Sequence, residues 1–177
     1  KAKQLGFPIA LKLVAPEIVH KTESGAVVLG LKSASEVEAA GKDLLAKASQ
    51  AHLLLQEMIQ GTEVLVGARS DPQYGPFLMV GLGGIFVEVL KDVALRLLPV
   101  SEAEAVEMLK ELRGYKILTG VRGQPPRDLK ALARAMAGVS ELFAVQREHL
   151  SDFEINPLMV RPEGQGAVAV DVRLVRK

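Results

Sequence analysis

Two segments near the end of the chain predict a β-hairpin: Asp152-Phe153-Glu154-Ile155-Asn156-Pro157-Leu158 and Ala167-Val168-Ala169-Val170-Asp171-Val172. Strand side chains alternate between two faces, so Asp152, Glu154 and Asn156 share one face, and Phe153 and Ile155 take the other. In the second segment the valines form the apolar row, which leaves Asp171 on the polar face. The intervening Pro162-Glu163-Gly164-Gln165-Gly166 is typical of a hairpin turn.

Closing this hairpin brings Asn156 and Asp171 to opposite or diagonal positions on one face. Carboxylate and amide oxygens held on rigid strands are ligands that Mg²⁺ prefers. The residues therefore indicate a magnesium site. A solvated outer face of an edge hairpin is the alternative that the same pattern allows.

The composition bounds the class of protein. The 177 residues, 49% hydrophobic and 24% charged, suit a soluble globular chain of one domain or two small lobes. A formal net charge of +1 argues against binding to nucleic acid, and the absence of cysteine excludes disulfides, thiolate metal sites and a cysteine nucleophile. The longest uncharged apolar stretch, residues 77–87, is far shorter than the ~20 residues that span a bilayer. We expect a cytoplasmic protein, and a chain that starts at Lys1 without methionine suggests a piece of a longer polypeptide.

Residues 1–58 predict a first lobe of β-β-α-β order. Ile9–Val14 and Gly25–Leu31 are short, apolar and rich in β-branched residues, which is typical of strands. Ser33-x-x-Glu36 is a capping box that opens a helix reaching about residue 49. A third strand is expected at Leu53–Met58.

Residues 59–177 predict a second lobe that ends in the hairpin. Strands are expected at Glu63–Ala68 and Phe77–Leu82, and the alternation of residues 85–97 would place Glu88, Asp92 and Arg96 on one face of an unbroken strand. Helices are expected from the capping box at Ser101 to about residue 113, and along the apolar stripe of residues 129–143. Strand pairs mixed with helices, without regular βαβ alternation, favour an α+β fold. A nucleotide could lie between the two lobes.

Three candidate features carry chemistry besides the hairpin. Gly81-Leu82-Gly83-Gly84-Ile85-Phe86 fails as a dinucleotide motif because Phe86 stands at the third glycine position, so a tight turn is expected there. Lys12, within an apolar strand, is either a snorkelling or salt-bridged residue, or a fixed positive charge for phosphate. His20, in a polar loop, is either surface decoration or a nucleophile toward phosphorus.

Three stretches together resemble the ATP-grasp domain of the NDP-forming acyl-CoA synthetases. They are residues 10–14 with Val19-His20-Lys21-Thr22-Glu23, then Asp71-Pro72-Gln73-Tyr74-Gly75-Pro76 with residues 81–93, and finally Glu154-Ile155-Asn156-Pro157-Leu158. Within that family the chain is most similar to β subunits of ADP-forming acetate–CoA ligases, and more distantly to those of succinyl-CoA synthetase. The resemblance implies an ATP-grasp fold of two lobes, 1–58 as a lid-like lobe and 59–177 as a C-terminal lobe, without the opening part of that fold.

The resemblance also implies an enzyme. Acyl-CoA, ADP and phosphate would interconvert with acid, CoA and ATP through a phosphohistidine, with a CoA-binding module as partner and no nucleic acid or membrane involved. It implies His20 as the phosphate relay and Asn156 and Asp171 as Mg²⁺ ligands. The residues that it implies at the nucleotide are Lys12, Lys21, Glu57, Glu63, Gly83, Gly84 and Glu88.

Two interpretations stay open on the sequence. One is the nucleotide module of an acid–CoA ligase, which we expect to be inactive on acyl-CoA without its CoA-binding module. The other is a catalytically silent ATP-grasp domain that regulates a multidomain protein such as a lysine acetyltransferase. Joint retention of Lys12, His20, Asn156 and Asp171 favours the enzyme, whereas Ala26, where a second glycine is usual in the family, is a departure.

Overall fold

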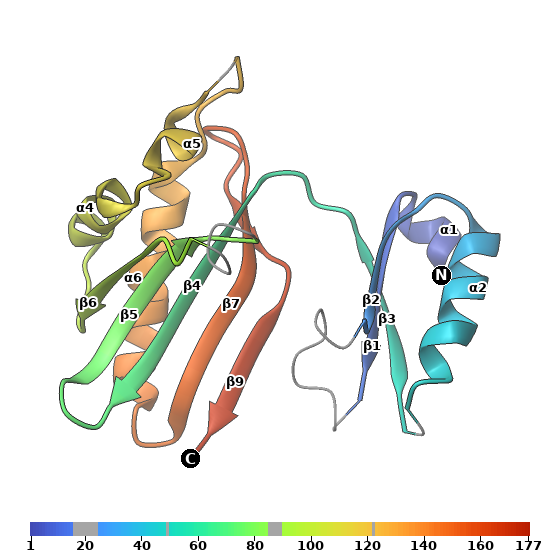
Figure 1. The fold of residues 1–177 in the computed structure, drawn as a ribbon, viewed down its shortest axis with the longest axis horizontal. Helices are drawn as coiled ribbons and strands as arrows, with labels where there is room; N and C mark the ends of the chain where they lie inside the picture. Colours follow the sequence, from blue (N-terminus) through green and yellow to red (C-terminus); the bar gives the residue numbers. More distant parts are fainter. Residues whose placement is uncertain (16–24, 49, 85–89, 122) are drawn as a thin grey trace. The chain divides into compact units, whose positions relative to one another are not determined.

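The structure is a computed structural model that describes residues 1–15, 25–48, 50–84, 90–121 and 123–177 (Figure 1). The chain divides into two units, Lys1–Met58 and Ile59–Lys177. The first unit contains α1 (Ala2–Leu5), β1 (Ile9–Val14), β2 (Val27–Leu31), α2 (Ala34–Leu45) and β3 (His52–Glu57). The second contains β4 (Thr62–Asp71), β5 (Gly75–Leu82), β6 (Val93–Leu97), α4 (Glu102–Glu111), α5 (Tyr115–Thr119), α6 (Leu129–Gln146), β7 (Leu150–Val160), β8 (Ala167–Ala169) and β9 (Val172–Arg176). Within the described ranges, no helix is long and apolar enough to cross a membrane.

The first unit is a three-stranded antiparallel sheet with one helix against it. The strand order is β2-β1-β3. Leu11 and Leu13 of β1 are buried and pack in one cluster with Leu44 of α2. The helix begins where the capping box predicts, because the Ser33 side chain accepts a hydrogen bond from the backbone N–H of Glu36. The elements β1, β2, α2 and β3 follow in the order expected from the sequence, and the short helix α1 before them was not expected.

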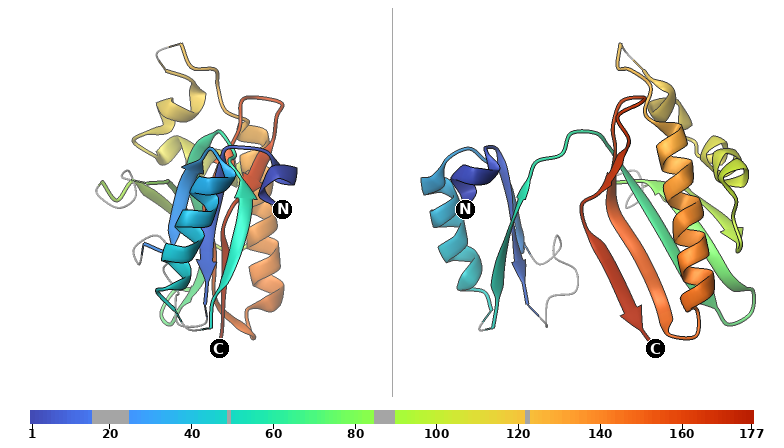
Figure 2. Two further views of the ribbon diagram at one scale, coloured as in Figure 1. Left: turned by 90° about the vertical axis from the view of Figure 1, so that its right-hand side faces the viewer. Right: turned by 180° about the vertical axis from the view of Figure 1, so that it is seen from behind.

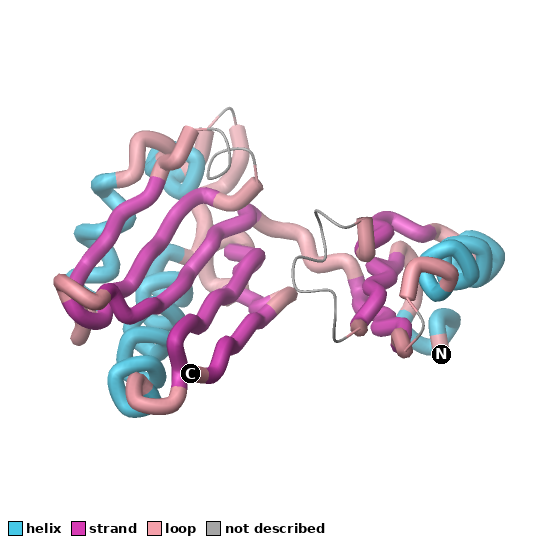
Figure 3. Tube along the Cα trace, turned by 60° about the horizontal axis from the view of Figure 1, so that its bottom comes forward, coloured by secondary structure: helices cyan, strands magenta, loops and turns pink. Residues whose placement is uncertain are grey.

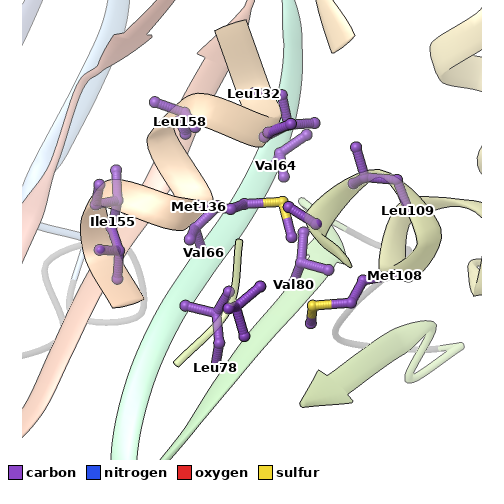
Figure 4. Packing of buried hydrophobic residues seen from close by; sticks show 14 of the residues in the cluster. Val64, Val66, Leu78, Val80, Met108, Leu109, Leu132, Met136, Ile155 and Leu158 are labelled. Atoms are coloured by element: carbon purple, nitrogen blue, oxygen red, sulfur yellow. The ribbon is translucent and has the colours of Figure 1, made fainter. Parts of the chain in front are cut away.

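The second unit is a six-stranded antiparallel sheet covered on one face by helices. The strand order is β6-β5-β4-β7-β8, and β9 also pairs with β7. In this unit α6 runs along the sheet, and Figure 3 shows the helices on one side of the strands (Figures 2 and 3). The core lies between them, and its labelled members in Figure 4 are Val64, Val66, Leu78, Val80, Met108, Leu109, Leu132, Met136, Ile155 and Leu158. Burying this apolar surface is the main source of stability.

The start of α6 is tied to the turn of the closing hairpin by one carboxylate. Asp128 caps the helix by accepting a hydrogen bond from the backbone N–H of Ala131 at 3.0 Å, and it accepts a second from Gly166 at 2.9 Å. These two donors, Ala131 first, lower the pKa of Asp128 below its ordinary value, although burial opposes them. The residue therefore holds the hairpin turn against the helix.

One expectation about the strands is wrong. The unbroken strand expected over residues 85–97 is interrupted, because residues 90–92 belong to no strand and β6 begins only at Val93. Residues 85–89, Glu88 among them, lie outside the described residues. Lys91 has a backbone φ of +49°, outside the extended region, and the buried Asp92 accepts hydrogen bonds from the backbone N–H groups of Arg113 and Gly114, each at 2.8 Å. Asp92 therefore anchors the loop before the strand, and Arg96 instead forms an ion pair with Glu111.

Candidate functional site

The closing hairpin places Asn156 directly opposite Asp171. Ile155 pairs with Val172 on one side of them and Leu158 pairs with Ala169 on the other, which makes Asn156 and Asp171 register partners. The backbone N–H of Asn156 donates to the carbonyl oxygen of Asp171 at 3.0 Å. Opposed residues of antiparallel strands project their side chains on the same face. The juxtaposition predicted from alternation is confirmed, and both residues are at least partly exposed.

The face of β7 that carries Asn156 also carries acidic residues, as alternation predicts. Phe153 and Ile155 are buried in the core under the helices, so Asp152 and Glu154 lie on the opposite face of the sheet. Figure 1 shows β9 alongside β7 at this edge (Figure 1). Asp152 is itself buried, with 8% of its surface exposed, which sequence patterning did not indicate.

Two arginines that the sequence analysis missed explain how these carboxylates are accommodated. Arg69 of β4 donates to Asp152 Oδ2 from Nε at 2.8 Å and from Nη2 at 2.6 Å. Arg173 of β9 donates from Nη2 to Asp152 Oδ1 at 3.1 Å and to Glu154 Oε2 at 3.0 Å. Both arginines stand opposite the acids in the strand register, Arg69 facing Asp152 and Arg173 facing Glu154. The position of Arg173 follows from the register of the closing hairpin, two residues after Asp171, whereas that of Arg69 depends on the pairing of β4 with β7, which are distant in sequence.

Asn156 is joined to the same network through its side-chain amide. Its Nδ2 donates to Glu154 Oε1 at 3.4 Å, the long end of hydrogen-bond distances. No group of three or more histidine, cysteine, aspartate or glutamate side chains within the described residues could hold a metal. Asn156 and Asp171 still fit Mg²⁺, because this ion is commonly bound by one or two protein oxygens, substrate phosphates and water.

Lys12 lies in the middle of β1, opposite Val27 of β2 and Leu54 of β3. It is 4% exposed, so its charge is not held out in water at the surface. The ammonium group of a lysine buried this deeply requires polar or anionic groups around it. Its burial argues against the snorkelling alternative, and its role toward phosphate stays a prediction.

Glu63 and the Gly83-Gly84 turn meet in the second unit. The backbone N–H of Gly83 donates to the carbonyl oxygen of Glu63 at 2.7 Å. A Cβ on Gly83 would lie 2.7 Å from Glu63 Cβ and 3.0 Å from its carbonyl carbon, so only glycine fits this approach. Gly84 has a backbone φ of +62° and lies close to the Glu63 side chain. The tight turn predicted here is confirmed.

The remaining predicted site residues divide into two groups. Glu57 is exposed at the end of β3, in the first unit. His20, Lys21 and Glu88 lie outside the described residues.

A family model described as "ATP-grasp domain" matches residues 1–175. The chain belongs to the ATP-grasp family. It is 37% identical over 184 residues to the acetate–CoA ligase [ADP-forming] II subunit beta of Pyrococcus furiosus, and the match covers 99% of this chain and 78% of that subunit. It is 35% identical to the 4-hydroxybutyrate–CoA ligase [ADP-forming] of Nitrosopumilus maritimus over 98% of this chain, but only 26% of that ligase. The relatives of this ATP-grasp chain thus include both separate β subunits and longer ligase chains.

Solved structures give the same result. The dinucleotide forming acetyl-coenzyme A synthetase 1 of Ca. Korarchaeum cryptofilum, in complex with coenzyme A and Ca-AMPCP, superposes with a TM-score of 0.87 at 37% identity, and the match covers 99% of this chain and 79% of that one. Another structure of that enzyme, with coenzyme A and Mg-AMPPCP, has a phosphohistidine segment described as pointing towards the nucleotide binding site. Its TM-score is 0.82 at 38% identity, and the match covers 99% of this chain and 79% of that one. The fold predicted from the resemblance is confirmed.

Proposed function

We propose that this chain is the nucleotide-binding, phosphoryl-transfer module of an ADP-forming acid–CoA ligase. Residues 1–58 are assigned as its lid-like lobe and residues 59–177 as its C-terminal lobe. The observation that carries the proposal is the register of the closing hairpin, which sets Asn156 against Asp171 on one face. Its support is a match over nearly the whole chain to β subunits of such ligases.

In this proposal Asn156 and Asp171 hold Mg²⁺ on the nucleotide, and the ion supplies charge neutralisation on the phosphate oxygens. Lys12 adds a fixed positive charge to the phosphates. A buried lysine is suited to this because it acts in a site of low dielectric, where charge interactions are stronger than in water. Phosphoryl transfer requires mostly alignment and electrostatic stabilisation, which these groups provide.

The other predicted residues complete the nucleotide site. Glu57, Glu63 and Glu88 are assigned to nucleotide contacts, together with Lys21. Gly83 and Gly84 are assigned to the same site, where their backbone would approach the nucleotide. Glycine at position 83 is required in any case by its close approach to Glu63.

His20 is assigned as the relay between this module and a CoA-binding module, either a separate subunit or part of a longer chain. A neutral imidazole nitrogen attacks phosphorus, and the resulting P–N bond is later broken as an ADP oxygen takes the phosphoryl group to form ATP. The carboxylic acid and CoA would be handled in the partner module. Longer relatives such as the Nitrosopumilus ligase show that a chain of this kind occurs within one larger polypeptide.

The test is phosphorylation of the complete protein, together with its CoA-binding module, by γ-labelled ATP and Mg²⁺. We expect acid-labile label on His20, and we expect His20→Gln to abolish it. His52→Gln is the matched control, because His52 is an exposed histidine of β3 that the proposal gives no role. Nucleotide binding without label on His20 would overturn the relay and favour a silent regulatory module.

A further inference from the structure

Arg173 bridges two carboxylates beside the hairpin pair. One nitrogen, Nη2, donates both to Asp152 Oδ1 at 3.1 Å and to Glu154 Oε2 at 3.0 Å. The Arg173 side chain is 28% exposed, against 61% for Arg69, so Arg173 is the more enclosed of the two arginines around Asp152. A half-buried, charge-assisted contact of this kind restricts the carboxylates more than an exposed surface pair does.

The bridge leaves one oxygen of Glu154 to face Asn156. Arg173 engages Oε2, and the other oxygen, Oε1, accepts from Asn156 Nδ2. An ionised carboxylate can only accept hydrogen bonds, so the amide nitrogen of Asn156, and not its oxygen, must point at Glu154. The Asn156 Oδ1 atom is thereby turned away from Glu154.

We propose that Arg173 is a positioning residue for Mg·nucleotide binding: it fixes Glu154, and Glu154 orients the Asn156 amide so that Oδ1 faces the metal. This inference rests on the proposed function, since it assigns the metal to Asn156 and Asp171. The hydrogen bonds from Arg173 to Glu154 and from Asn156 to Glu154 thus hold the metal-binding side of the hairpin in place. Residues that orient metal ligands typically control metal affinity by 10–100-fold.

Charge alone makes the opposite prediction. Arg69, Arg173, Asp152 and Glu154 together carry no net formal charge. Removing the Arg173 cation would leave an excess of negative charge near the site, which attracts Mg²⁺ more strongly. A weakening of metal binding therefore reports the loss of orientation and not the loss of charge.

Arg173→Lys separates these effects because it keeps the charge and removes the planar guanidinium. The lysine Nζ is a point charge on a flexible stem that ends one bond short of the Nη2 position, so it does not hold the fixed bridge between Asp152 and Glu154. The affinities of the complete protein for Mg·ADP, and for ADP with a chelator, are measured by calorimetry. We expect Arg173→Lys to weaken Mg·ADP binding roughly tenfold and metal-free ADP binding less than about twofold. A second measurement replaces Mg²⁺ by Mn²⁺ and records the electron paramagnetic resonance spectrum of bound Mn²⁺·ADP. We expect this spectrum to differ between Arg173→Lys and the unaltered protein.

Arg69→Lys is the matched control. It loses the two hydrogen bonds from Arg69 to Asp152 but leaves the contacts of Arg173 with Glu154 in place. We expect it to lower the unfolding midpoint without changing the ratio of Mg·ADP to ADP affinity.

The other outcomes overturn the inference. Unchanged or tighter Mg·ADP binding in Arg173→Lys would show that Arg173 does not orient the site. Equal losses with and without metal would show that its role is structural only. Failure of the unaltered protein to bind Mg·ADP would instead refute the proposed function, and this inference with it.

Discussion

Replacing Gly83 by alanine tests the close approach between the glycine turn and Glu63. The new Cβ would lie 2.7 Å from Glu63 Cβ and 3.1 Å from the Glu63 carbonyl oxygen, and strand backbone cannot move aside cheaply. Overpacking costs about 1–3 kcal/mol, and weakening the 2.7 Å hydrogen bond from Gly83 to Glu63 adds about 1 kcal/mol. The lower entropy of the unfolded alanine chain returns only about 0.4–1 kcal/mol.

Strain therefore wins, and we expect Gly83→Ala to lower the free energy of unfolding of the second unit by about 2–3 kcal/mol. The assay is urea denaturation followed by circular dichroism. Gly138→Ala is the matched control: Gly138 is exposed within α6, and a Cβ added there would meet no atom within 4 Å, so the variant should gain about 0.5–1 kcal/mol. An unchanged or higher stability for Gly83→Ala would refute this account of the turn.

Three further changes give distinct outcomes. Asp171→Ala should weaken Mg·ADP binding at least about tenfold while metal-free ADP binding stays near normal; equal loss of both in calorimetry would make Asp171 structural. Asp128→Ala should cost about 1–2 kcal/mol at pH 7 through the lost helix cap. Because the pKa of Asp128 is lowered in the folded state, that difference should be full above its ordinary pKa near 4 and shrink as pH falls below it, as unfolding titrations from pH 2 to 7 would show. Ser101→Ala should remove the reciprocal capping box of α4 and cost about 1 kcal/mol by thermal unfolding, with no change in nucleotide affinity.

Local patterns were enough to predict most elements of the fold. Short apolar runs located β1 and β5, and the capping boxes located the starts of α2 and α4 within one residue, because these signals depend on neighbours in the chain. The short helices α1 and α5 were not predicted. The alternating strand expected from residue 85 is also broken at residues 90–92, where a left-handed Lys91 and the hydrogen bonds of Asp92 to a distant turn depart from extended backbone.

Only the part of the candidate site that lies within the closing hairpin could be predicted from the sequence. Asn156 lies in β7, and Asp171 lies in the two-residue break between β8 and β9, where the sequence predicted a continuous strand. Both β8 and β9 pair with β7 in one register across a short turn, so the opposition of Asn156 and Asp171 still follows from alternation and turn position. The network around Asp152 depends on Arg69, which is distant in sequence and meets β7 through the pairing of β4 with β7. No local pattern specifies that pairing, and so the ion pair of Asp152 with Arg69 was not predicted.

The double role of Asp128 has a consequence for how the second unit opens. Its carboxylate holds the amide of Ala131 in the first turn of α6 and the amide of Gly166 in the hairpin turn. Neither amide can exchange its proton with solvent while that carboxylate stays in place, so one local opening should expose both. In deuterium exchange the amides of Ala131 and Gly166 should therefore lose protection at matching rates. The exchange rate at the end of the helix would then also report how often the hairpin turn beside it opens.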